Sequence, residues 1–215
     1  MKNPLLELLF PPKCIFCRKV LPPGDPWLCE SCRRTRTGMD LMRNGRYFRQ
    51  CFVPMRYESP VRDAILRYKF QGRDCYAEIL GEILAETIEE ELDGLFDLIT
   101  WVPVSPQRLR ERGYDQARLL AEAVARRLDR HALETLEKVR HNSRQSGLED
   151  EKARKANVKD VYSPLNPEAF RGKRLLLIDD IITTGATMDE AAKTLRKAGA
   201  AEVVAAALAL PVKSM

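Results

Sequence analysis

Long apolar runs are absent from this 215-residue sequence, in which no stretch of about 18 or more apolar residues occurs. This absence excludes a membrane-spanning helix. A short apolar run over residues 5–10 is interrupted by Glu7 and ends at Pro11 and Pro12, without a small-residue cleavage site. We therefore expect no signal peptide, and we expect a cytoplasmic protein.

Several nucleotide-binding and catalytic signatures are also missing. The sequence has no GxxxxGK[ST] loop and no GxGxxG, which excludes a P-loop and a Rossmann dinucleotide site. Histidine occurs only twice, at His131 and His141, and neither has a visible partner that would make it catalytic. At 45% hydrophobic and 31% charged residues the chain is globular, and its length suits one α/β domain with a small appendage.

Four of the six cysteines have the spacing of a metal site. Two CxxC pairs, separated by eleven residues, comprise Cys14, Cys17, Cys29 and Cys32. Each pair presents two thiolates from one tight turn, so that two pairs complete a tetrahedral four-sulfur site. We predict a zinc ribbon with structural Zn²⁺, and an iron–sulfur cluster is the alternative. Without an export signal disulfides are not expected, and Cys51 and Cys75 are interpreted as small hydrophobic residues.

Positive charge is concentrated directly after this cysteine segment. The formal net charge is +5, and between residues 33 and 49 six arginines face one acid, Asp40. These arginines are Arg33, Arg34, Arg36, Arg43, Arg46 and Arg49. Together with Tyr47 and Phe48 they form a mixture that can follow phosphates and stack on bases. Single-stranded nucleic acid binding and a solvated basic linker are both open interpretations.

The most informative stretch is residues 174–199. Its apolar run from Leu175 to Ile178 lacks period-two alternation, which predicts a parallel strand buried on both faces. Because Asp179 and Asp180 are costly to bury, we expect the chain to surface there. A hydroxyl-rich loop then enters a helix that ends near Gly199, and this loop consists of Thr183, Thr184, Gly185, Ala186 and Thr187. Such a loop is a seat for phosphate, and two neighbouring acids can bind a vicinal diol or Mg²⁺, so the combination fits a sugar phosphate.

Two further segments complete the predicted site. A buried strand over residues 97–104 is followed by an arginine-rich segment with Arg108, Arg110, Arg112 and Gly113. Arginine forks match pyrophosphate, and ligands of α/β proteins bind at the carboxyl ends of parallel strands. The polar stretch over residues 137–162 is either disordered or a lid that excludes water from the site.

The run LLLIDDIITTGATM resembles the phosphoribosyl pyrophosphate (PRPP) signature of type I phosphoribosyltransferases. With the four-cysteine segment and the blocks VRDAILRYKFQG, VPVSPQRLRERGYDQ and SRQSGLEDEKARKANV, the chain resembles the ComF family, which is associated with DNA uptake. The resemblance implies a zinc ribbon and basic linker over residues 1–50. It also implies a type I phosphoribosyltransferase fold, a parallel sheet flanked by helices, over residues 51–215.

The same resemblance implies roles for single residues. Asp179 and Asp180 would bind the ribose of Mg²⁺–PRPP and stabilise the positive charge that develops on it, and residues 183–187 would bind its 5′-phosphate. Arg140 or Arg154 would cover the leaving group. The pyrophosphate would lie near Arg108, Arg112, Gly113 and Tyr114.

Two functions follow from this resemblance. One is pentosyl transfer from PRPP to an acceptor that the sequence does not identify, in DNA uptake or nucleotide metabolism. The other is a non-catalytic sensor of PRPP or a nucleotide that binds single-stranded DNA or a competence helicase. The absence of a cysteine at position 2, and of room for a glutaminase domain, argues against the use of glutamine-derived ammonia.

Overall fold

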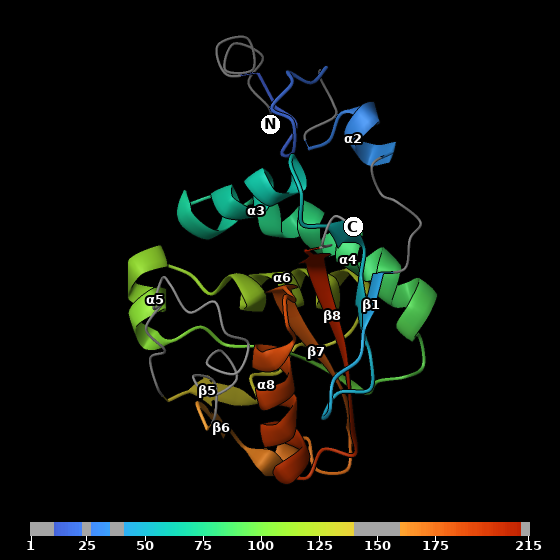
Figure 1. Cartoon of the computed structure of the whole chain (residues 1–215), viewed down its shortest axis with the longest axis vertical. Helices are drawn as coiled ribbons and strands as arrows, with labels where there is room; N and C mark the ends of the chain where they lie inside the picture. The colour runs from blue at the N-terminus through green and yellow to red at the C-terminus, as the bar shows by residue number, and fades with distance from the viewer. Residues whose placement is uncertain (1–10, 23–26, 35–40, 140–159, 212–215) are drawn as a thin grey trace.

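The computed structural model describes residues 11–22, 27–34, 41–139 and 160–211 (Figure 1). In these ranges no helix has the length and apolar character needed to cross a bilayer. The elements, in chain order, are α2 (Glu30–Arg34), β1 (Leu41–Arg43), β2 (Cys51–Val53), β3 (Met55–Arg56), α3 (Val61–Phe70), α4 (Tyr76–Leu92), β4 (Leu98–Trp101), α5 (Pro106–Arg112), α6 (Gln116–Arg127), β5 (Leu136–Lys138), β6 (Tyr162–Pro164), η1 (Pro167–Ala169), β7 (Arg174–Ile181), α8 (Ala186–Lys197) and β8 (Glu202–Leu210).

The centre of the protein is a mostly parallel sheet. Its strand order is β1-β2-β8-β7-β4, and β3 also pairs with β8. Strands β2, β3 and β7 each pair parallel with β8, and β4 pairs parallel with β7, whereas β1 pairs antiparallel with β2. Pro54, which has no backbone N–H to donate, separates β2 from β3. The predicted strand over residues 97–104 is shorter than expected and covers only Leu98–Trp101.

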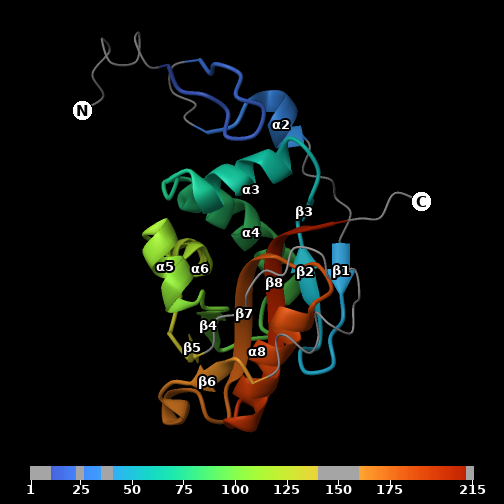
Figure 2. The ribbon, with the colours of Figure 1, turned by 60° about the vertical axis from the view of Figure 1, so that its left-hand side comes forward.

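The apolar run of β7 is buried on both faces, as its composition predicts. Leu176 and Ile178 join the core on the side of α4 and α6, whereas Leu175 and Leu177 join the core on the side of α8. Successive side chains of a strand point to opposite faces, so a strand covered on both sides needs apolar residues at every position. Figure 2 shows α8 on one side of the strands and α6 on the other.

Two helices, α5 and α6, begin with a short polar side chain that accepts hydrogen bonds from free backbone N–H groups. Asp115 precedes α6 and its Oδ1 accepts hydrogen bonds from the amides of Ala117 and Arg118 at 3.0 and 3.1 Å. Ser105 precedes α5, and its Oγ accepts from the amide of Arg108. Both caps lie just after β4, so they fix the backbone at the carboxyl end of the sheet.

The cysteine module, residues 11–22 and 27–34, lies at one end of the molecule above α3 (Figures 1 and 2). Ile15 and Phe16 are buried in the same core as α3 and α4. Arg67 of α3 donates to the carbonyl oxygens of both residues, at 2.5 and 3.0 Å. The module is therefore joined to the larger domain by apolar packing and by charge-assisted hydrogen bonds.

Two expectations from the sequence are wrong. Asp180 does not reach the surface, because β7 continues through it to Ile181 and the residue is 4% exposed. Its burial is compensated by an ion pair with Lys69 of helix α3, and no local sequence pattern reveals this partner. Cys75 is exposed and directly precedes α4, so only Cys51, which is fully buried in β2, behaves as a small hydrophobic residue.

Candidate functional site

Two adjacent acids stand at the carboxyl end of β7. Asp179 is half-buried, Asp180 is buried, and the amide of Asp180 donates to Oδ1 of Asp179 at 2.8 Å. Burial and the neighbouring Asp180 raise the pKa of Asp179 well above its usual range. Two carboxylates side by side with little water repel one another, so the free protein favours a bound proton or cation here.

Lys69, the next-to-last residue of α3, compensates one of these acids. Its Nζ lies 2.8 Å from Oδ1 of Asp180, and the side chains are 15% and 5% exposed. The other oxygen of Asp180, Oδ2, is buried and has no hydrogen-bond donor among the described residues. A buried carboxylate oxygen without a donor is costly, and a ligand hydroxyl or a cation would satisfy it.

The loop that follows the acids begins α8 in the way the sequence predicts. Gly185 is the residue before the helix, and its φ of 81° is left-handed, a conformation that favours glycine. It provides no side chain to cap the helix, so the first backbone N–H groups of α8 point toward the loop. Thr183 is exposed, Thr184 and Thr187 are half-buried, and Oγ1 of Thr184 accepts from the amide of Ala186 at 3.3 Å.

The basic segment around β1 packs against this loop. A Cβ added to Gly185 would stand 3.6 Å from Cδ of Arg43 and 3.8 Å from Cζ of Phe48. The amide of Tyr47 donates to Oδ1 of Asp189, in the first turn of α8, at 2.7 Å. Residues 41–48 thus form a wall of the loop, and this wall brings the positive charge of Arg43 toward it.

The segment after β4 lies at the same edge of the sheet. Oδ2 of Asp115 accepts from the amide of Val104 at 2.9 Å, which fixes the backbone just beyond the strand. Arg108 is half-buried, and its charge acts on both Lys138 and Tyr162, on which Asp179 also acts. Arg108 and Asp179 therefore share two neighbours, Lys138 and Tyr162.

The other predicted residues of this segment contact α3 and the turn beyond α5. The guanidinium of Arg112 lies 4.8 Å from the ring centroid of Phe70, and Tyr114 donates its hydroxyl hydrogen to the carbonyl of Tyr68. Gly113 ends α5 with a left-handed φ of 82° and is exposed. Arg140 and Arg154, predicted to cover the leaving group, lie outside the described residues.

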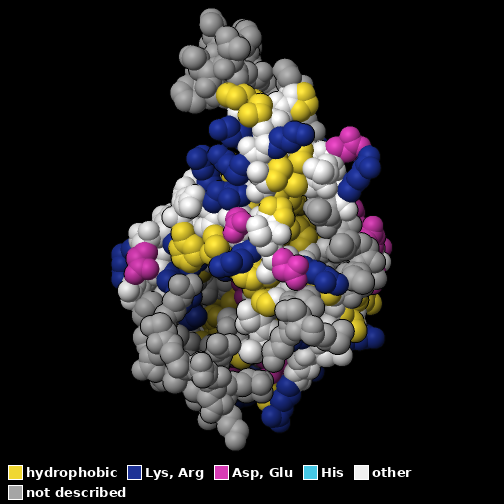
Figure 3. Space-filling view, turned by 45° about the horizontal axis from the view of Figure 1, so that its top comes forward, with side chains coloured by type: hydrophobic (Ala, Val, Ile, Leu, Met, Phe, Trp, Pro, Cys, Tyr) yellow, Lys and Arg dark blue, Asp and Glu magenta, His cyan; other side chains and the backbone are white. Residues whose placement is uncertain are grey.

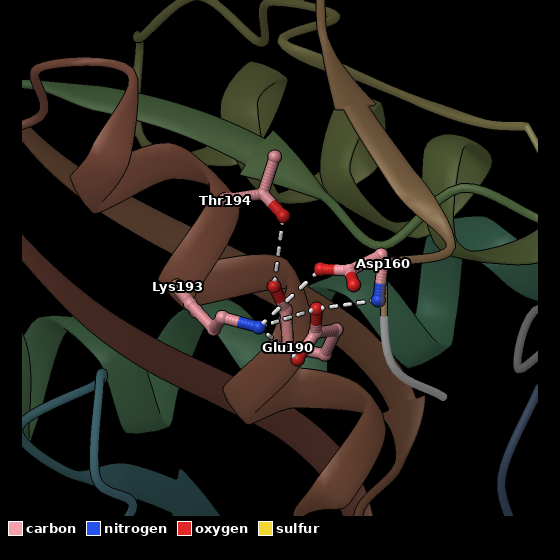
Figure 4. Close-up of polar contacts among 4 residues, drawn as sticks. All are labelled: Asp160, Glu190, Lys193 and Thr194. Atoms are coloured by element: carbon pink, nitrogen blue, oxygen red, sulfur yellow. Dashed lines mark hydrogen bonds and ion pairs between the residues drawn. The ribbon is translucent and has the colours of Figure 1, made fainter. Parts of the chain in front are cut away.

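The two ends of the polar stretch over residues 137–162, predicted to be either disordered or a lid, lie in two short strands that pair with each other, β5 and β6. On β5, Lys138 is half-buried with its Nζ 5.3 Å from the ring centroid of Tyr162, and burial lowers its pKa. Figure 4 shows that Asp160, just before β6, is held by α8: its amide donates to Oε1 of Glu190 at 2.8 Å. Lys193 also donates to Oε1 of Glu190 at 2.9 Å, so the chain just before β6 is anchored to α8.

The four cysteines of the module form one cluster. Their sulfur atoms all lie within 4.8 Å of one another, and Sγ of Cys17 and Cys29 are 3.6 Å apart. Tetrahedral zinc with Zn–S bonds of about 2.3 Å places its sulfurs about 3.8 Å apart, so the cluster fits a four-thiolate metal ion. A hydrogen bond with Ser31 lowers the pKa of Cys29 to about 6, whereas burial raises the pKa of Cys32 in the same cluster.

Comparison with known proteins gives the family. A phosphoribosyl transferase domain matches residues 115–213. Competence protein F of Haemophilus influenzae is 30% identical, with 89% of this chain and 93% of that protein aligned. The chain belongs to the ComF family. Competence protein ComFC of Bacillus subtilis is also 30% identical over 89% of this chain and 74% of that protein. DNA utilization protein YhgH of Escherichia coli is 28% identical over 91% of this chain and 96% of that protein.

The predicted type I phosphoribosyltransferase fold with an N-terminal four-cysteine cluster is confirmed for this ComF-family chain by the domain match, the parallel sheet and the cluster. Sequence reasoning missed Lys69 and Arg43 at the site. The ComF-family block RYKFQG contains Lys69 and was the only signal available for it. Arg43 gave no signal, because it lies in an arginine-rich segment without a readable motif.

Proposed function

We propose that this ComF-family chain binds Mg²⁺–PRPP at the carboxyl edge of its sheet and transfers the phosphoribosyl group to an acceptor. The observation that carries the proposal is the pair Asp179 and Asp180, in which Oδ2 of Asp180 is buried without a donor among the described residues. The pair stands directly before a loop whose last residue, Gly185, has no side chain to cap α8. One end of this arrangement suits a ribose diol or a cation, and the other suits a phosphate.

The roles follow from charge and position. The ribose hydroxyls donate to the twin acids, and residues 183–187 hold the 5′-phosphate with backbone and threonine donors. Mg²⁺, when bound, would be held by the acids together with ligand oxygens and would neutralise the pyrophosphate. Arg108 and Lys138 supply positive charge on the side of the segment after β4. The assignments of Arg112, Gly113, Tyr114, Arg140 and Arg154 stay predictions.

The chemistry that these residues support is loss of pyrophosphate from the ribose. As the bond to the leaving group breaks, positive charge develops on the ribose ring, and the carboxylates stabilise it electrostatically. Their surroundings favour this step, because burial and the neighbouring Asp180 raise the pKa of Asp179, so that positive charge developing next to this carboxylate stabilises its ionised form. A cationic transition state supplies that charge.

We further propose that the reaction serves DNA uptake or the handling of nucleotides derived from DNA, since the relatives are named for competence and DNA utilization. The cysteine module is proposed to hold structural Zn²⁺, and its cysteine geometry supports this. The alternative is a PRPP sensor that binds single-stranded DNA or a helicase. Lys and Arg side chains gather beside hydrophobic ones on the upper part of the face in Figure 3, and this mixture supports the alternative.

Calorimetry with PRPP and Mg²⁺ tests the binding site. We expect the Asp179→Asn, Asp180→Asn double variant to lose PRPP binding at least tenfold, and Gly185→Val to do the same because valine is strained at a φ of 81°. The matched control is Asp93→Asn, an exposed acid after α4. Unchanged binding by the double variant would refute the site.

Pyrophosphate release separates the two functions. Release that depends on an added acceptor and disappears in the double variant supports transfer, whereas binding without release supports the sensor. Salt-dependent binding of single-stranded DNA that weakens when Arg43, Arg46 and Arg49 become alanine supports the nucleic-acid role.

A further inference from the structure

The last turn of α3 is held by the segment that joins α5 to α6, and α3 lies above α5 in both views of the ribbon (Figures 1 and 2). The last four backbone carbonyls of an α-helix have no partner within the helix, and Tyr68 belongs to this group in α3. The hydroxyl of Tyr114 donates to the carbonyl oxygen of Tyr68. A side chain from a distant part of the sequence therefore satisfies this end of the helix.

The contact between Tyr68 and this segment is reciprocal. The side chain of Tyr68 is fully buried, and its hydroxyl donates to the carbonyl oxygen of Gln116 at 2.8 Å. The rings of Tyr68 and Tyr114 pack with their centroids 6.0 Å apart and their planes tilted by 36°. Each tyrosine thus hydrogen-bonds backbone on the other side of the contact, and the packed rings exclude water that would compete for these bonds.

Lys69 lies between two residues that are fixed against this segment. Tyr68 precedes it, and Phe70, which follows it, has its ring centroid 4.8 Å from the guanidinium carbon of Arg112. A lysine ammonium sits on a flexible four-carbon stem, so only its backbone and its partner place it. Nζ of Lys69 is 2.8 Å from Oδ1 of Asp180, and a shift of the helix end by about 1 Å is enough to separate a hydrogen-bonded pair.

This ion pair controls the charge of the proposed PRPP site. Three acids act on one another there: Asp179 and Asp180 of β7, and Asp115 before α6. Burial and Asp180 raise the pKa of Asp179, whereas the positive charge of Lys69 lowers it. Without that charge the acids take up a proton more readily, and a protonated carboxyl is a poor acceptor for ribose hydroxyls and a poor ligand for Mg²⁺.

We propose that Tyr114 is a positioning residue, which holds the last turn of α3 so that Lys69 stays paired with Asp180 and the acids are ready for Mg²⁺–PRPP. Tyr68 is its partner in this task. Tyr114 acts on the ligand through Lys69, because its hydroxyl hydrogen is already used by the carbonyl oxygen of Tyr68. This inference rests on the proposed function, since it concerns how that site is prepared for its ligand.

Chemical labelling of lysines reports the ion pair without any ligand. Only the neutral amine reacts with acetic anhydride, and an adjacent carboxylate favours the ammonium form. In the full-length Tyr114→Phe variant, which keeps the ring and loses the hydroxyl, we expect Lys69 to be acetylated at least fivefold faster, as measured by mass spectrometry of its peptides. Lys193 serves as the internal reference, because it pairs with Glu190 and its side chain is 14% exposed, against 15% for Lys69. Its rate should stay unchanged, which excludes a general loosening of the fold.

Tyr76→Phe is the matched control for this labelling. It also removes a buried tyrosine hydroxyl that takes part in a tertiary hydrogen bond, but the partner is Arg18 of the cysteine module, at 3.1 Å. We expect Lys69 to react in this variant as it does in the unchanged protein. Equal acetylation of Lys69 in Tyr114→Phe and in the unchanged protein would overturn the proposal.

Calorimetry with PRPP and Mg²⁺ at two pH values tests the consequence for the site. We expect Tyr114→Phe to bind PRPP at least fivefold more weakly than the unchanged protein at pH 7. At pH 8.5 the difference should shrink to about twofold, because the acids lose the extra proton that the displaced Lys69 no longer keeps away. Tyr76→Phe should match the unchanged protein at both pH values. A loss that is equal at pH 7 and pH 8.5 counts against positioning, because removal of a direct contact with the ligand has no such pH dependence.

A cycle of variants shows whether Tyr114 acts through Lys69. The Lys69→Met protein has no ammonium to position, so adding Tyr114→Phe to it should change the Kd for PRPP by less than twofold. A fivefold effect of Tyr114→Phe in both backgrounds would contradict the proposal. If the unchanged protein does not bind PRPP, the proposed function fails, and the labelling of Lys69 by itself decides whether Tyr114 positions it.

Discussion

Replacement of Lys69 by methionine tests the electrostatics on which the site depends. Lys69 Nζ and Asp180 Oδ1 are 2.8 Å apart and both side chains are largely buried. At an effective dielectric constant of about 20, the attraction between two unit charges at this distance is roughly 6 kcal/mol. Part of it offsets the loss of hydration of both groups, and removal of one partner of such a pair costs about 3–5 kcal/mol because the other charge stays buried.

We therefore expect the free energy of unfolding of Lys69→Met to be lower by about 3–5 kcal/mol, measured by urea unfolding followed by circular dichroism. The dependence of this free energy on urea concentration should match that of the unchanged protein, which confirms that the same single transition is observed. For a chain of this length the loss corresponds to a melting temperature lower by roughly 10 °C. Lys69→Arg should recover most of the stability. Lys173→Met, at an exposed lysine before β7, should change it by less than about 0.5 kcal/mol.

A double-variant cycle gives the decisive comparison. If Lys69 acts through Asp180, Lys69→Met costs much less in a protein that already carries Asp180→Asn, because no buried charge is left uncompensated. A coupling free energy of at least about 2 kcal/mol is expected. Costs that simply add, or a Lys69→Met penalty below about 1 kcal/mol, would refute the reasoning.

Three further predictions concern other parts of the molecule. Asp179→Asn should raise the urea midpoint at pH 8: the folded-state pKa of Asp179 is raised, so its contribution to stability falls as the pH rises from about 4 through that pKa. Hydrogen bonds from Arg174 lower the pKa of Asp97 to about 2, so its contribution is present above about pH 4 and is lost as the pH falls toward 2; Asp97→Asn should make acid unfolding in this range shallower, as followed by circular dichroism. Cys32→Ser should reduce bound zinc from about one ion per chain to a small fraction, measured by a chromogenic chelator. It should also speed hydrogen exchange at Ile15 while the amides of β7 stay protected. Retention of the metal would contradict the four-sulfur assignment.

Much of the fold was predictable because it depends on local rules. The apolar run of β7 predicts a strand covered on both faces, because a local run of apolar residues is enough to indicate it. The paired CxxC spacing predicts a cluster because each pair needs only its own turn to bring two sulfurs together. A position was not predictable where burial of a side chain is costly by local rules but is compensated by a residue distant in the sequence. Asp180, paired with Lys69, is the clearest case.

The sequence by itself determined which residue types stand beside one another along the chain: twin acids, a threonine-rich loop and a following helix, all within residues 174–199. These are consecutive, so covalent geometry alone keeps them together at the end of one strand. Only the tertiary structure decided that Lys69, more than one hundred positions earlier, neutralises Asp180, and that Arg43 approaches Gly185. The physical reason is that burial and charge pairing act through space, on residues that the chain leaves far apart.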